Sequence, residues 1–486
     1  MIDKTRTITC EHLIGFSPDA TARARRIEIA DGVVMSVGGT SGGPVDRLLA
    51  LPVLVNAHDH GRAVRTSSVG AFGKPLESWL HYGALFPSVD PYLASVVALS
   101  NSALGGAGVV MMHYTRAQGF TDLPTEVAEV ARAARDVGVR TGFAVSMRDR
   151  NPLVYGASEP VLSALPAAAR AEIEGRFLSR SPLQPKDQIA LVDAVAEAAA
   201  GPDFNVQYGP NGVQWCSNAL LEGIAEASQR TGRRVHMHLL ETRYRRAWLD
   251  ANYPDGGVRF LDKIGLLSPR LTLAHCVWAR PDELELLAER GVTIVTNSSS
   301  NLHLRSGVAP AGKMLGCGCR LALGIDGRAL DDDDDALREM RLTHLLHAGT
   351  GFTTAASQAQ ILQSAVGLGR LSVTNRDDGG AIVHGAPADL LLLDWAALED
   401  DRLRDDLDPV DLLFSRATSR HIAEVIVAGR TIVRDRQVLG VDLPAARAEV
   451  LSQMRAGMPA GASLATALPA LDQAIAVHME REFGCS

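Results

Sequence analysis

The sequence predicts an α/β fold: a (β/α)8 TIM-like barrel with a small β-sandwich domain formed from the N- and C-terminal segments. Between residues 52 and 326, eight short apolar or β-branched runs alternate with amphipathic segments, as in a parallel barrel. Short alternating strands flank this region on both sides, which indicates a β domain. The length of 486 residues also favours two domains, because single hydrophobic cores stop growing at roughly 250 to 300 residues.

The barrel is expected to occupy residues 52–377. Helices are predicted where apolar residues recur three or four positions apart, at residues 123–137, 186–200, 219–230 and 281–290. The eight strands are predicted at residues 52–57, 108–113, 139–145, 204–209, 234–240, 271–276, 292–297 and 320–326.

The small domain is expected to be discontinuous and to comprise residues 1–51 and 378–443. The first segment contains alternating strands near residues 7–10, 26–29 and 33–37, and the second contains AEVIVAGRTIVRD, in which Gly429 favours a hairpin turn. Residues 444–486 are rich in alanine and have a helical pattern, so they are expected to form a C-terminal helical extension.

Composition excludes several classes of partner. The net charge of -8 leaves no basic surface for nucleic acid or for an anionic membrane. Residues 91–114 carry no formal charge, but Asn101, Ser102 and the Gly105-Gly106 pair favour a helix followed by a buried strand over a membrane span. The amino terminus has no apolar signal region and the six cysteines are scattered, so a reducing, cytoplasmic location is expected.

Polar side chains stand at the ends of four predicted strands. Because the carboxyl ends of barrel strands meet at one rim, these side chains are expected to lie together. They are His58 and His60 after the first strand, His238 in the fifth, His275 in the sixth and Asp326 in the eighth.

Four of these residues are predicted to hold one divalent metal ion such as zinc. His58 and His60 are two positions apart on a strand and share a face, whereas Asp59 points elsewhere. With His238 and Asp326 they supply nitrogen and oxygen ligands and leave one position for water, whose pKa falls towards about 7 on such an ion.

Glu241, His275 and Asp326 are the predicted catalytic residues. Glu241 follows His238 by three positions and could take a proton from the water and deliver it to a leaving group. His275 could hydrogen-bond the nucleophile or polarise the substrate, and Asp326 could share the proton of the water. His236 is expected to support the site or fill the core. The run Asp331 to Asp335 is expected to cap the next helix, with Asp331 nearest the site.

These motifs together resemble the amidohydrolase superfamily, specifically its branch of aminoheterocycle deaminases and triazine hydrolases. The likeness covers nearly the whole chain. It implies a mononuclear metal, usually zinc and sometimes Fe2+, on the four ligands, and hydroxide attack on a ring carbon that bears an amine or another leaving group. It is carried by VNAHDH, HMHLLET, LAHC, LGIDG, SSSNLHLRSGVAP, GAPADLLLLD and VIVAGR.

One loop departs from the adenosine-type members of this branch. They carry a histidine after the fourth strand, where this chain has YGPNGVQWCS and Asn211, which favours triazine, oxopurine or pterin substrates. Arg62 could hold an anionic or carbonyl-bearing substrate or form a salt bridge at the rim. Trp79 and Trp215 could stack on a flat ring or simply pack. The candidate substrate contacts are Arg62, Trp79, His113, Asn211, Trp215 and Asn301.

Three functions remain open from the sequence. The first is hydrolytic deamination of a small aminated N-heterocycle, such as a purine base, pterin or triazine, with release of ammonia. The second keeps the site but removes chloride or an alkylamine, or opens a cyclic amide or urea. The third is a non-catalytic metal-binding barrel, which the complete set of ligands and proton carriers disfavours. A homo-oligomer, a dimer or larger, is expected from the resemblance.

Overall fold

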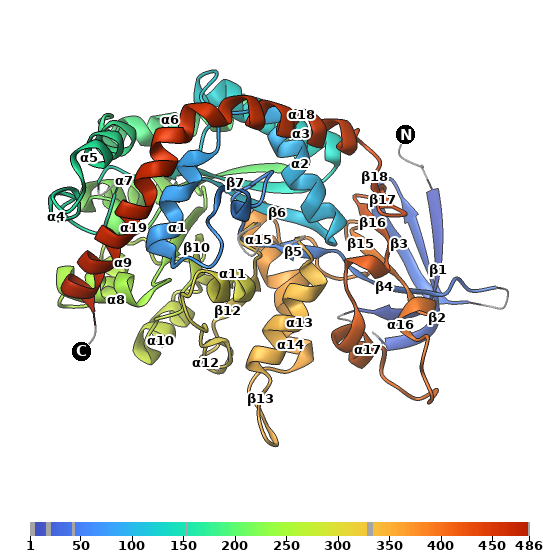
Figure 1. The fold of residues 1–486 in the computed structure, drawn as a ribbon. Coiled ribbons are helices and arrows are strands. Elements are labelled where there is room, and N and C mark those ends of the chain that lie inside the picture. The colour runs from blue at the N-terminus through green and yellow to red at the C-terminus, as the bar shows by residue number, and fades with distance from the viewer. Residues whose placement is uncertain (1–4, 16–20, 41–43, 151–152, 328–333, 485–486) are drawn as a thin grey trace.

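The computed structural model describes residues 5–15, 21–40, 44–150, 153–327 and 334–484. Eight parallel strands form the central sheet, in the order β12-β11-β10-β9-β8-β7-β6-β5, and helices surround it (Figure 1). The strands are β5 (Leu54–Asn56), β6 (Ala107–Tyr114), β7 (Arg140–Met147), β8 (Phe204–Pro210), β9 (Val235–Leu239), β10 (Leu271–His275), β11 (Thr293–Thr296) and β12 (Arg320–Leu323). The predicted barrel is confirmed, and all eight predicted strands are present.

The first and last strands meet where the barrel closes. The amide of Ala57, just after β5, donates to the carbonyl of Leu323 at the end of β12 at 2.8 Å. The amide of Asp326 donates to the carbonyl of His58, also at 2.8 Å. Two hydrogen bonds therefore hold the ends of strands one and eight side by side, and both ends carry site residues.

The barrel helices begin and end where their sequences predict. In α3 (Leu123–Val137), the Asp122 carboxylate accepts the amide of Thr125, a proline occupies the first turn, and Gly138 ends the helix at φ 96°. The remaining helices of the first half are α1 (Leu76–Tyr82), α2 (Pro91–Leu104), α4 (Glu159–Leu162), α5 (Ala167–Ile173), α6 (Pro185–Ala198) and α7 (Asn218–Thr231), with the short turns η1 (Thr66–Val69), η2 (Gly83–Leu85), η3 (Glu174–Leu178) and η4 (Val213–Trp215).

The second half of the barrel continues in the same way. The Asp335 carboxylate accepts the amide of Arg338 at the start of α13 (Ala336–His347), as expected for a cap, whereas Asp331 lies outside the described residues. The other helices are α8 (Arg243–Asn252), α9 (Gly257–Lys263), α10 (Pro281–Glu289), α11 (Ser298–His303), α12 (Ala311–Gly316), α14 (Gln358–Gln363), η6 (Ser364–Leu368) and α15 (Gly369–Thr374), and the small hairpin is β13 (Gly349–Thr350) with β14 (Thr353–Thr354).

Both chain ends build the second sheet. Its order is β18-β17-β16-β15-β4-β1-β2-β3, and β4 joins the two segments by pairing with β1 on one side and β15 on the other. Its strands are β1 (Thr5–Ile14), β2 (Thr21–Ala30), β3 (Val33–Gly39), β4 (Leu48–Pro52), β15 (Leu390–Asp394), β16 (Ile422–Val427), β17 (Arg430–Arg434) and β18 (Gln437–Val438), and α16 (Trp395–Leu398), α17 (Pro409–Arg416) and η7 (Ser419–His421) lie between them. Ala428 and Gly429 form the predicted hairpin turn, both with positive φ.

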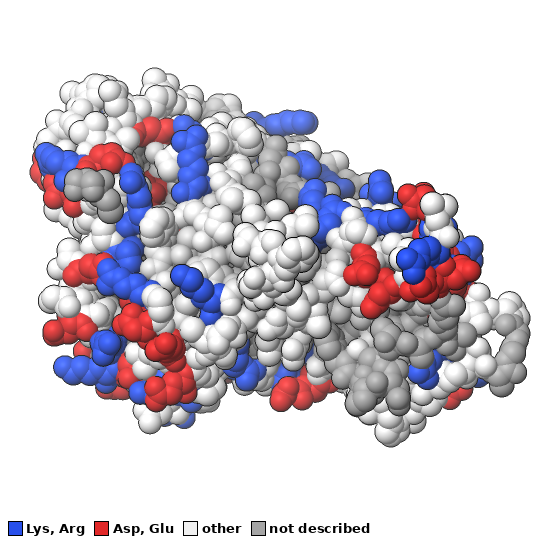
Figure 2. All heavy atoms as spheres, turned by 90° about the horizontal axis from the view of Figure 1, so that it is seen from below, with Lys and Arg blue, Asp and Glu red and all other residues white. Residues whose placement is uncertain are grey.

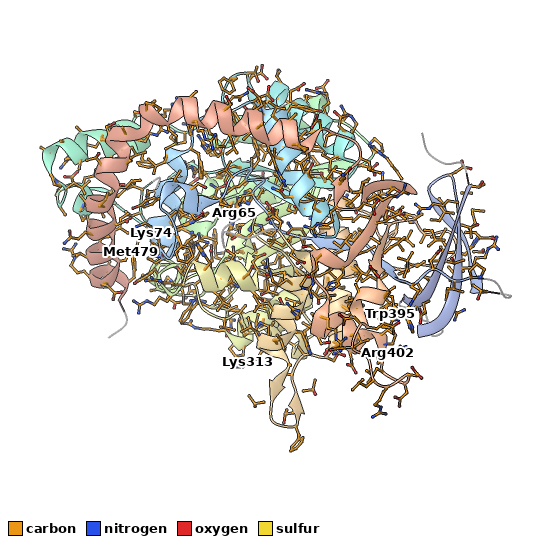
Figure 3. All side chains as sticks on the ribbon, turned by 45° about the vertical axis from the view of Figure 1, so that its right-hand side comes forward. Arg65, Lys74, Lys313, Trp395, Arg402 and Met479 are labelled. Atoms are coloured by element: carbon orange, nitrogen blue, oxygen red, sulfur yellow. The ribbon has the colours of Figure 1, made fainter. Side chains whose placement is uncertain are left out.

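The C-terminal residues form a helical arm across the barrel. They comprise α18 (Leu443–Gly457), η8 (Met458–Gly461) and α19 (Ala462–Phe483), and this arm runs over α2 and then down past α1 and α5 (Figure 1). Residues Leu443–Phe483 include an 18-residue window apolar enough to cross a membrane, of which 33% is buried in the protein. Lys74 binds Asp472 of α19 at 2.7 Å, and Figure 3 labels Lys74 beside Met479 of the same helix.

The surface carries charges of both signs. On the face seen in Figure 2, acidic and basic residues gather at both sides of the molecule, around a broad area with few charged side chains.

Candidate active site

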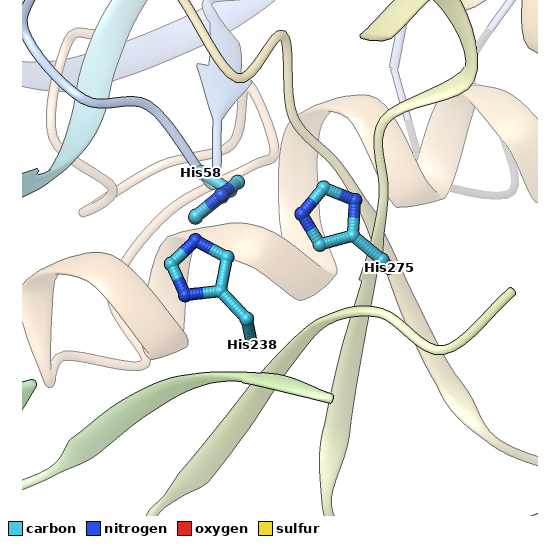
Figure 4. A group of neighbouring side chains, drawn as sticks. All are labelled: His58, His238 and His275. Carbon is cyan, nitrogen blue, oxygen red and sulfur yellow. The ribbon is translucent and has the colours of Figure 1, made fainter. Parts of the chain in front are cut away.

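The residues that were predicted to meet at the rim lie together at the carboxyl ends of the strands. His58 and His60 follow β5, His238 lies in β9, His275 ends β10 and Asp326 follows β12. Figure 4 shows the rings of His58, His238 and His275 facing one another from these strands. The barrel therefore gathers side chains that are up to 268 positions apart in the sequence, from His58 to Asp326.

The donor atoms of these side chains point at one another. The Asp326 Oδ1 atom lies 3.1 Å from Nε2 of His58 and 3.1 Å from Nε2 of His60. The Nε2 atoms of His60 and His238 are 3.3 Å apart. His275 joins the same group, because its ring nitrogen and those of His58 and His238 all lie within 4.8 Å of one another.

This donor set fits a divalent metal ion. Nε2 of His58 and Oδ1 of Asp326 are buried and have no hydrogen-bond partner, although buried polar atoms are nearly always paired. Imidazole nitrogens and a carboxylate oxygen that converge in this way are the ligands of zinc and related ions. The orphaned atoms therefore indicate a binding site for such an ion.

The protonation states of the ligands suit a metal. Burial lowers the pKa of His58 and of His60 to about 4, so both rings are neutral at pH 7. Burial alone would raise the pKa of Asp326, but the ring nitrogens of His58 and His60, 3.1 Å from its Oδ1 atom, outweigh burial and lower that pKa well below its usual value. Neutral imidazoles and an ionised carboxylate are the forms that bind metal.

Neighbouring groups orient each ligand ring. Nδ1 of His60 donates to the carbonyl of His113 at 2.9 Å, and Nδ1 of His238 donates to the carbonyl of Asn211 at 2.8 Å. Nδ1 of His58 shares a hydrogen bond of 2.7 Å with Nε2 of His236. A ring whose Nδ1 carries the proton presents the lone pair of Nε2 to a ligand, so these contacts aim the donors inward.

The carboxylate ligand is fixed in a similar way. The Ser300 hydroxyl, from α11, donates to Oδ2 of Asp326 at 2.6 Å, which leaves Oδ1 for the histidines. Asp326 has φ 64° and His275 has φ 76°, a left-handed conformation that non-glycine residues rarely adopt. Each such residue costs about 1–3 kcal/mol, and such strain concentrates at functional sites.

Glu241 and His275 form a pair beside the ligands. Oε2 of Glu241 lies 3.6 Å from Nε2 of His275 and 2.6 Å from Nη1 of Arg245. Nδ1 of His275 donates to the side-chain oxygen of Asn301 at 2.9 Å, which turns its Nε2 towards Glu241. Asn301 is thus a contact of His275.

Arg245 is a site residue that the sequence reasoning missed. Its guanidinium lies 4.6 Å from the centre of the Trp215 ring, and its Nε donates to the hydroxyl of Tyr155 at 3.1 Å. Burial alone would lower the pKa of Arg245, but the Glu241 carboxylate outweighs it and raises that pKa. The signal in the sequence was an arginine four positions after Glu241; the two side chains meet at the start of α8, across its N-cap residue Thr242. Ser300 was missed because only the fold brings it to Asp326.

Asp59 points away from the candidate metal ligands. Its Oδ2 accepts the side-chain amide of Asn56 at 2.7 Å and its Oδ1 accepts the amide of Gly61 at 2.8 Å. These bonds shape the turn that carries His60 and Arg62, which agrees with the expectation that Asp59 points elsewhere.

A cavity of about 1080 Å³ opens above this group of residues. Arg62, Trp79, Asn211 and Trp215 contribute to its wall. The Arg62 guanidinium lies 4.6 Å from the centre of the Trp79 ring, and its Nη1 donates to the carbonyl of Asp326 at 3.4 Å. The site residues at the base of the cavity are His60, His238, Glu241, His275 and Asp326.

Two of the candidate substrate contacts lie behind this wall. His113 is completely buried, with its Nε2 donating to the carbonyl of Gly209 at 3.0 Å, and Asn301 is 1% exposed. Both contact site histidines, as described above. A direct contact of either residue with substrate stays a prediction.

A barrel with these candidate ligands and a Glu–His pair at its rim contains the groups that a metal-dependent hydrolase requires. The chain belongs to the amidohydrolase family, whose sequence pattern matches residues 49–432. This finding confirms the family and the hydrolase class that the sequence motifs predicted.

Known proteins of several activities resemble this chain. A 5'-deoxyadenosine deaminase of Methanosarcina barkeri is 27% identical over 430 residues, which cover 86% of this chain and 89% of that protein. An adenosine deaminase of Xanthomonas campestris with bound zinc shares the fold with a TM-score of 0.77 at 23% identity, over 93% of this chain and 98% of the other. Atrazine chlorohydrolase of Arthrobacter aurescens, complexed with zinc, gives 0.72 at 23% identity, over 92% and 100%. Both structures contain zinc, and in this chain the donor set itself supports a divalent metal.

Proposed function

We propose that this enzyme is a zinc-dependent aminohydrolase that deaminates a small aminated N-heterocycle and releases ammonia. The observation that carries the proposal is the Glu241–His275 pair, 3.6 Å apart, which borders both the metal-ligand group and the cavity. A proton carrier that touches both the nucleophile and the substrate is what hydrolysis of a carbon–nitrogen bond requires.

The ligands we assign to zinc are His58, His60, His238 and Asp326. When bound, such an ion lowers the pKa of a coordinated water towards about 7 and so supplies hydroxide at neutral pH. Fe2+ suits the same mixed nitrogen and oxygen donors and is the alternative. Metal content of the purified protein, measured by mass spectrometry, separates the two.

The chain's own residues then move the protons. Glu241 takes a proton from the attacking water as its oxygen bonds to the ring carbon, and it delivers that proton to the departing nitrogen. His275 accepts a hydrogen bond from the nucleophile through Nε2, and Asp326 shares the proton through its carboxylate. The carbon–nitrogen bond breaks and ammonia leaves. The second proton of the water passes to a ring nitrogen, so the ring keeps an oxo group.

The cavity wall supports a flat substrate. Trp79 and Trp215 both contribute aromatic surface, and Arg62 offers donors close to Asp326. Purine bases, pterins and triazines are the ring systems we propose. Adenosine and 5'-deoxyadenosine are also tested, because relatives of this chain deaminate them. Asn211, however, stands where adenosine-type enzymes carry histidine.

The test is a screen of these compounds for ammonia release, with Glu241→Gln as the matched control. We expect one class to be turned over, and the variant to keep its metal and lose turnover by about 10²-fold or more. Unchanged turnover in the variant contradicts the role of Glu241. Release of chloride, an alkylamine or a ring-opened acid in place of ammonia supports the second function.

A non-catalytic barrel remains the third function. A purified protein that contains no metal after growth in zinc-supplemented medium, and that turns over none of the compounds, supports it. The homo-oligomer, the cytoplasmic location and the absence of nucleic-acid and membrane partners stay predictions.

A further inference from the structure

Seven arginines line the same cavity as the site. Arg62 and Arg245 are described above, Arg150 donates to the carbonyl of Val213 at 3.3 Å, and the other four take no part in the proposed catalytic machinery. One lies in the loop after β6, one directly follows β7, one lies in η3 and one follows η3 by two positions. We name them the arginine cluster: Arg116, Arg148, Arg176 and Arg180.

The geometry brings at least two of these guanidinium groups close together. Nη2 of Arg116 donates to the carbonyl of Phe86, and Nη2 of Arg176 donates to the carbonyl of Ala84 at 2.5 Å. These carbonyls are two positions apart at η2. Burial is the main cause that lowers the pKa of Arg116, and the charge of Arg176 lowers it further. The fold thus holds two like charges against the same short turn.

The arginine cluster is not neutralised by paired carboxylates within the part of the chain that the structure describes. None of its members forms an ion pair with a carboxylate there. Glu126 acts on Arg116 electrostatically, but its carboxylate accepts hydrogen bonds from the Tyr114 hydroxyl and from the amides of Gln118 and Gly119, at 2.7 to 2.8 Å. The Glu126 carboxylate therefore binds the loop after β6 and forms no ion pair with Arg116.

The four carboxylates in the cavity wall also bind partners outside the arginine cluster. Asp149 accepts the amide and the hydroxyl of Ser217 at 2.6 and 2.5 Å, at the start of α7. Glu77 accepts the hydroxyls of Tyr155 and Thr242 at 3.0 and 2.6 Å. The other two are Glu241, paired with Arg245, and Asp326, among the metal ligands.

We propose that the substrate carries an acidic group, a carboxylate or a phosphate, which binds the arginine cluster while the heterocycle lies against Glu241 and His275. This proposal rests on the proposed function and names the substrate class of the same site. Guanidinium forks match the planar or tetrahedral oxygens of these anions and bind them in pairs. The cavity of about 1080 Å³ also slightly exceeds the roughly 300–1,000 Å³ of small-molecule sites, so it has room for more than a bare ring.

The test compares probes that differ only in the acidic group. The pairs are adenosine with adenosine 5'-monophosphate, and pterin with pterin-6-carboxylate. Affinities are measured by calorimetry on the zinc-loaded Glu241→Gln protein, so that turnover does not interfere. Arg148→Gln and Arg180→Gln are the informative variants, because among the described residues neither side chain forms a hydrogen bond or an ion pair that holds the fold. Arg404→Gln is the control, since its side chain is 71% exposed and forms a pair with Asp406.

We expect the acidic member of at least one pair to bind about tenfold tighter or more, which is what one or two charge-assisted hydrogen bonds provide. Each of Arg148→Gln and Arg180→Gln should reduce that affinity about tenfold and leave the neutral member within about twofold. Arg404→Gln should change neither. The pair that shows the preference identifies phosphate or carboxylate as the group.

Equal affinities within both pairs, or a preference that the Arg148→Gln/Arg180→Gln double variant retains, would overturn the proposal. Ammonia release by the protein with Glu241 intact is measured in parallel. If ammonia is released but the acidic and neutral probes bind equally well, only the arginine-cluster proposal is wrong. An acidic preference that the variants abolish, without ammonia from any probe, sinks the deamination proposal alone.

Discussion

Replacing Arg245 by Met tests how the site holds the charge of Glu241. Oε2 of Glu241 lies 2.6 Å from Nη1 of Arg245, and the two side chains are only 2% and 3% exposed. Methionine keeps much of the apolar stem that packs in this region but removes the guanidinium. The variant therefore leaves a buried carboxylate without its cation.

The structure sets the size of the effect. Two unit charges whose centres are about 4 Å apart interact by about 4 kcal/mol at an effective dielectric constant of about 20. Removal of one partner of a buried pair generally costs about 3–5 kcal/mol. The barrel has about 330 residues and an unfolding entropy of about 2.1 cal/mol/K per residue, so the loss corresponds to a fall in Tm of about 4–7 °C.

The assay is thermal unfolding in the presence of a chelator, which separates the ion pair from metal binding. We expect the Arg245→Met protein to melt at the lower temperature and the Glu241→Gln/Arg245→Met double variant to recover most of the loss, because no unpaired charge remains. Arg245→Lys keeps the charge and should fall between them. If the double variant melts as low as the single variant, packing around Arg245 and not the charge of Glu241 explains the loss, and the reasoning fails.

Three further predictions concern groups around the ligands. Burial raises the pKa of Glu339 from 4.5 to about 7. Between these pH values the carboxyl group is protonated in the folded protein but ionised in the unfolded chain. The free energy of unfolding therefore falls as pH rises, and the total loss above pH 7 is about 3 kcal/mol. Glu339→Gln should therefore raise Tm at pH 8 and leave it unchanged at pH 4.5, and equal shifts at both would contradict this. His236→Phe removes the 2.7 Å partner of His58 and should weaken zinc binding about 10–100-fold in a chelator competition, since groups behind metal ligands contribute this much; unaltered affinity refutes it. Ser300→Ala removes the donor to Oδ2 of Asp326 and should lower kcat/KM about 10–100-fold, and full activity would show that Asp326 needs no such support.

Much of the fold could be predicted from the sequence because strand and helix patterns are local. The helix at residues 123–137 has the predicted bounds, since Asp122 and Gly138 mark its ends chemically. The uncharged residues 91–114 form α2 and β6, as the Gly105-Gly106 pair indicated. The meeting of the candidate ligands also followed from the sequence, because the carboxyl ends of all the barrel strands lie at one rim.

The sequence by itself determined the barrel, the gathering of His58, His60, His238 and Asp326, and the place of Glu241 beside them. Only the tertiary structure decided which groups stand behind these residues, because Ser300, His236 and Arg245 reach their partners through the closure of the barrel or the turn into α8. The arginine cluster is also a product of tertiary structure. Its members come from three separate segments, the loop after β6, the end of β7 and η3 with the residues that follow it. No periodic pattern in the sequence indicates that such segments meet.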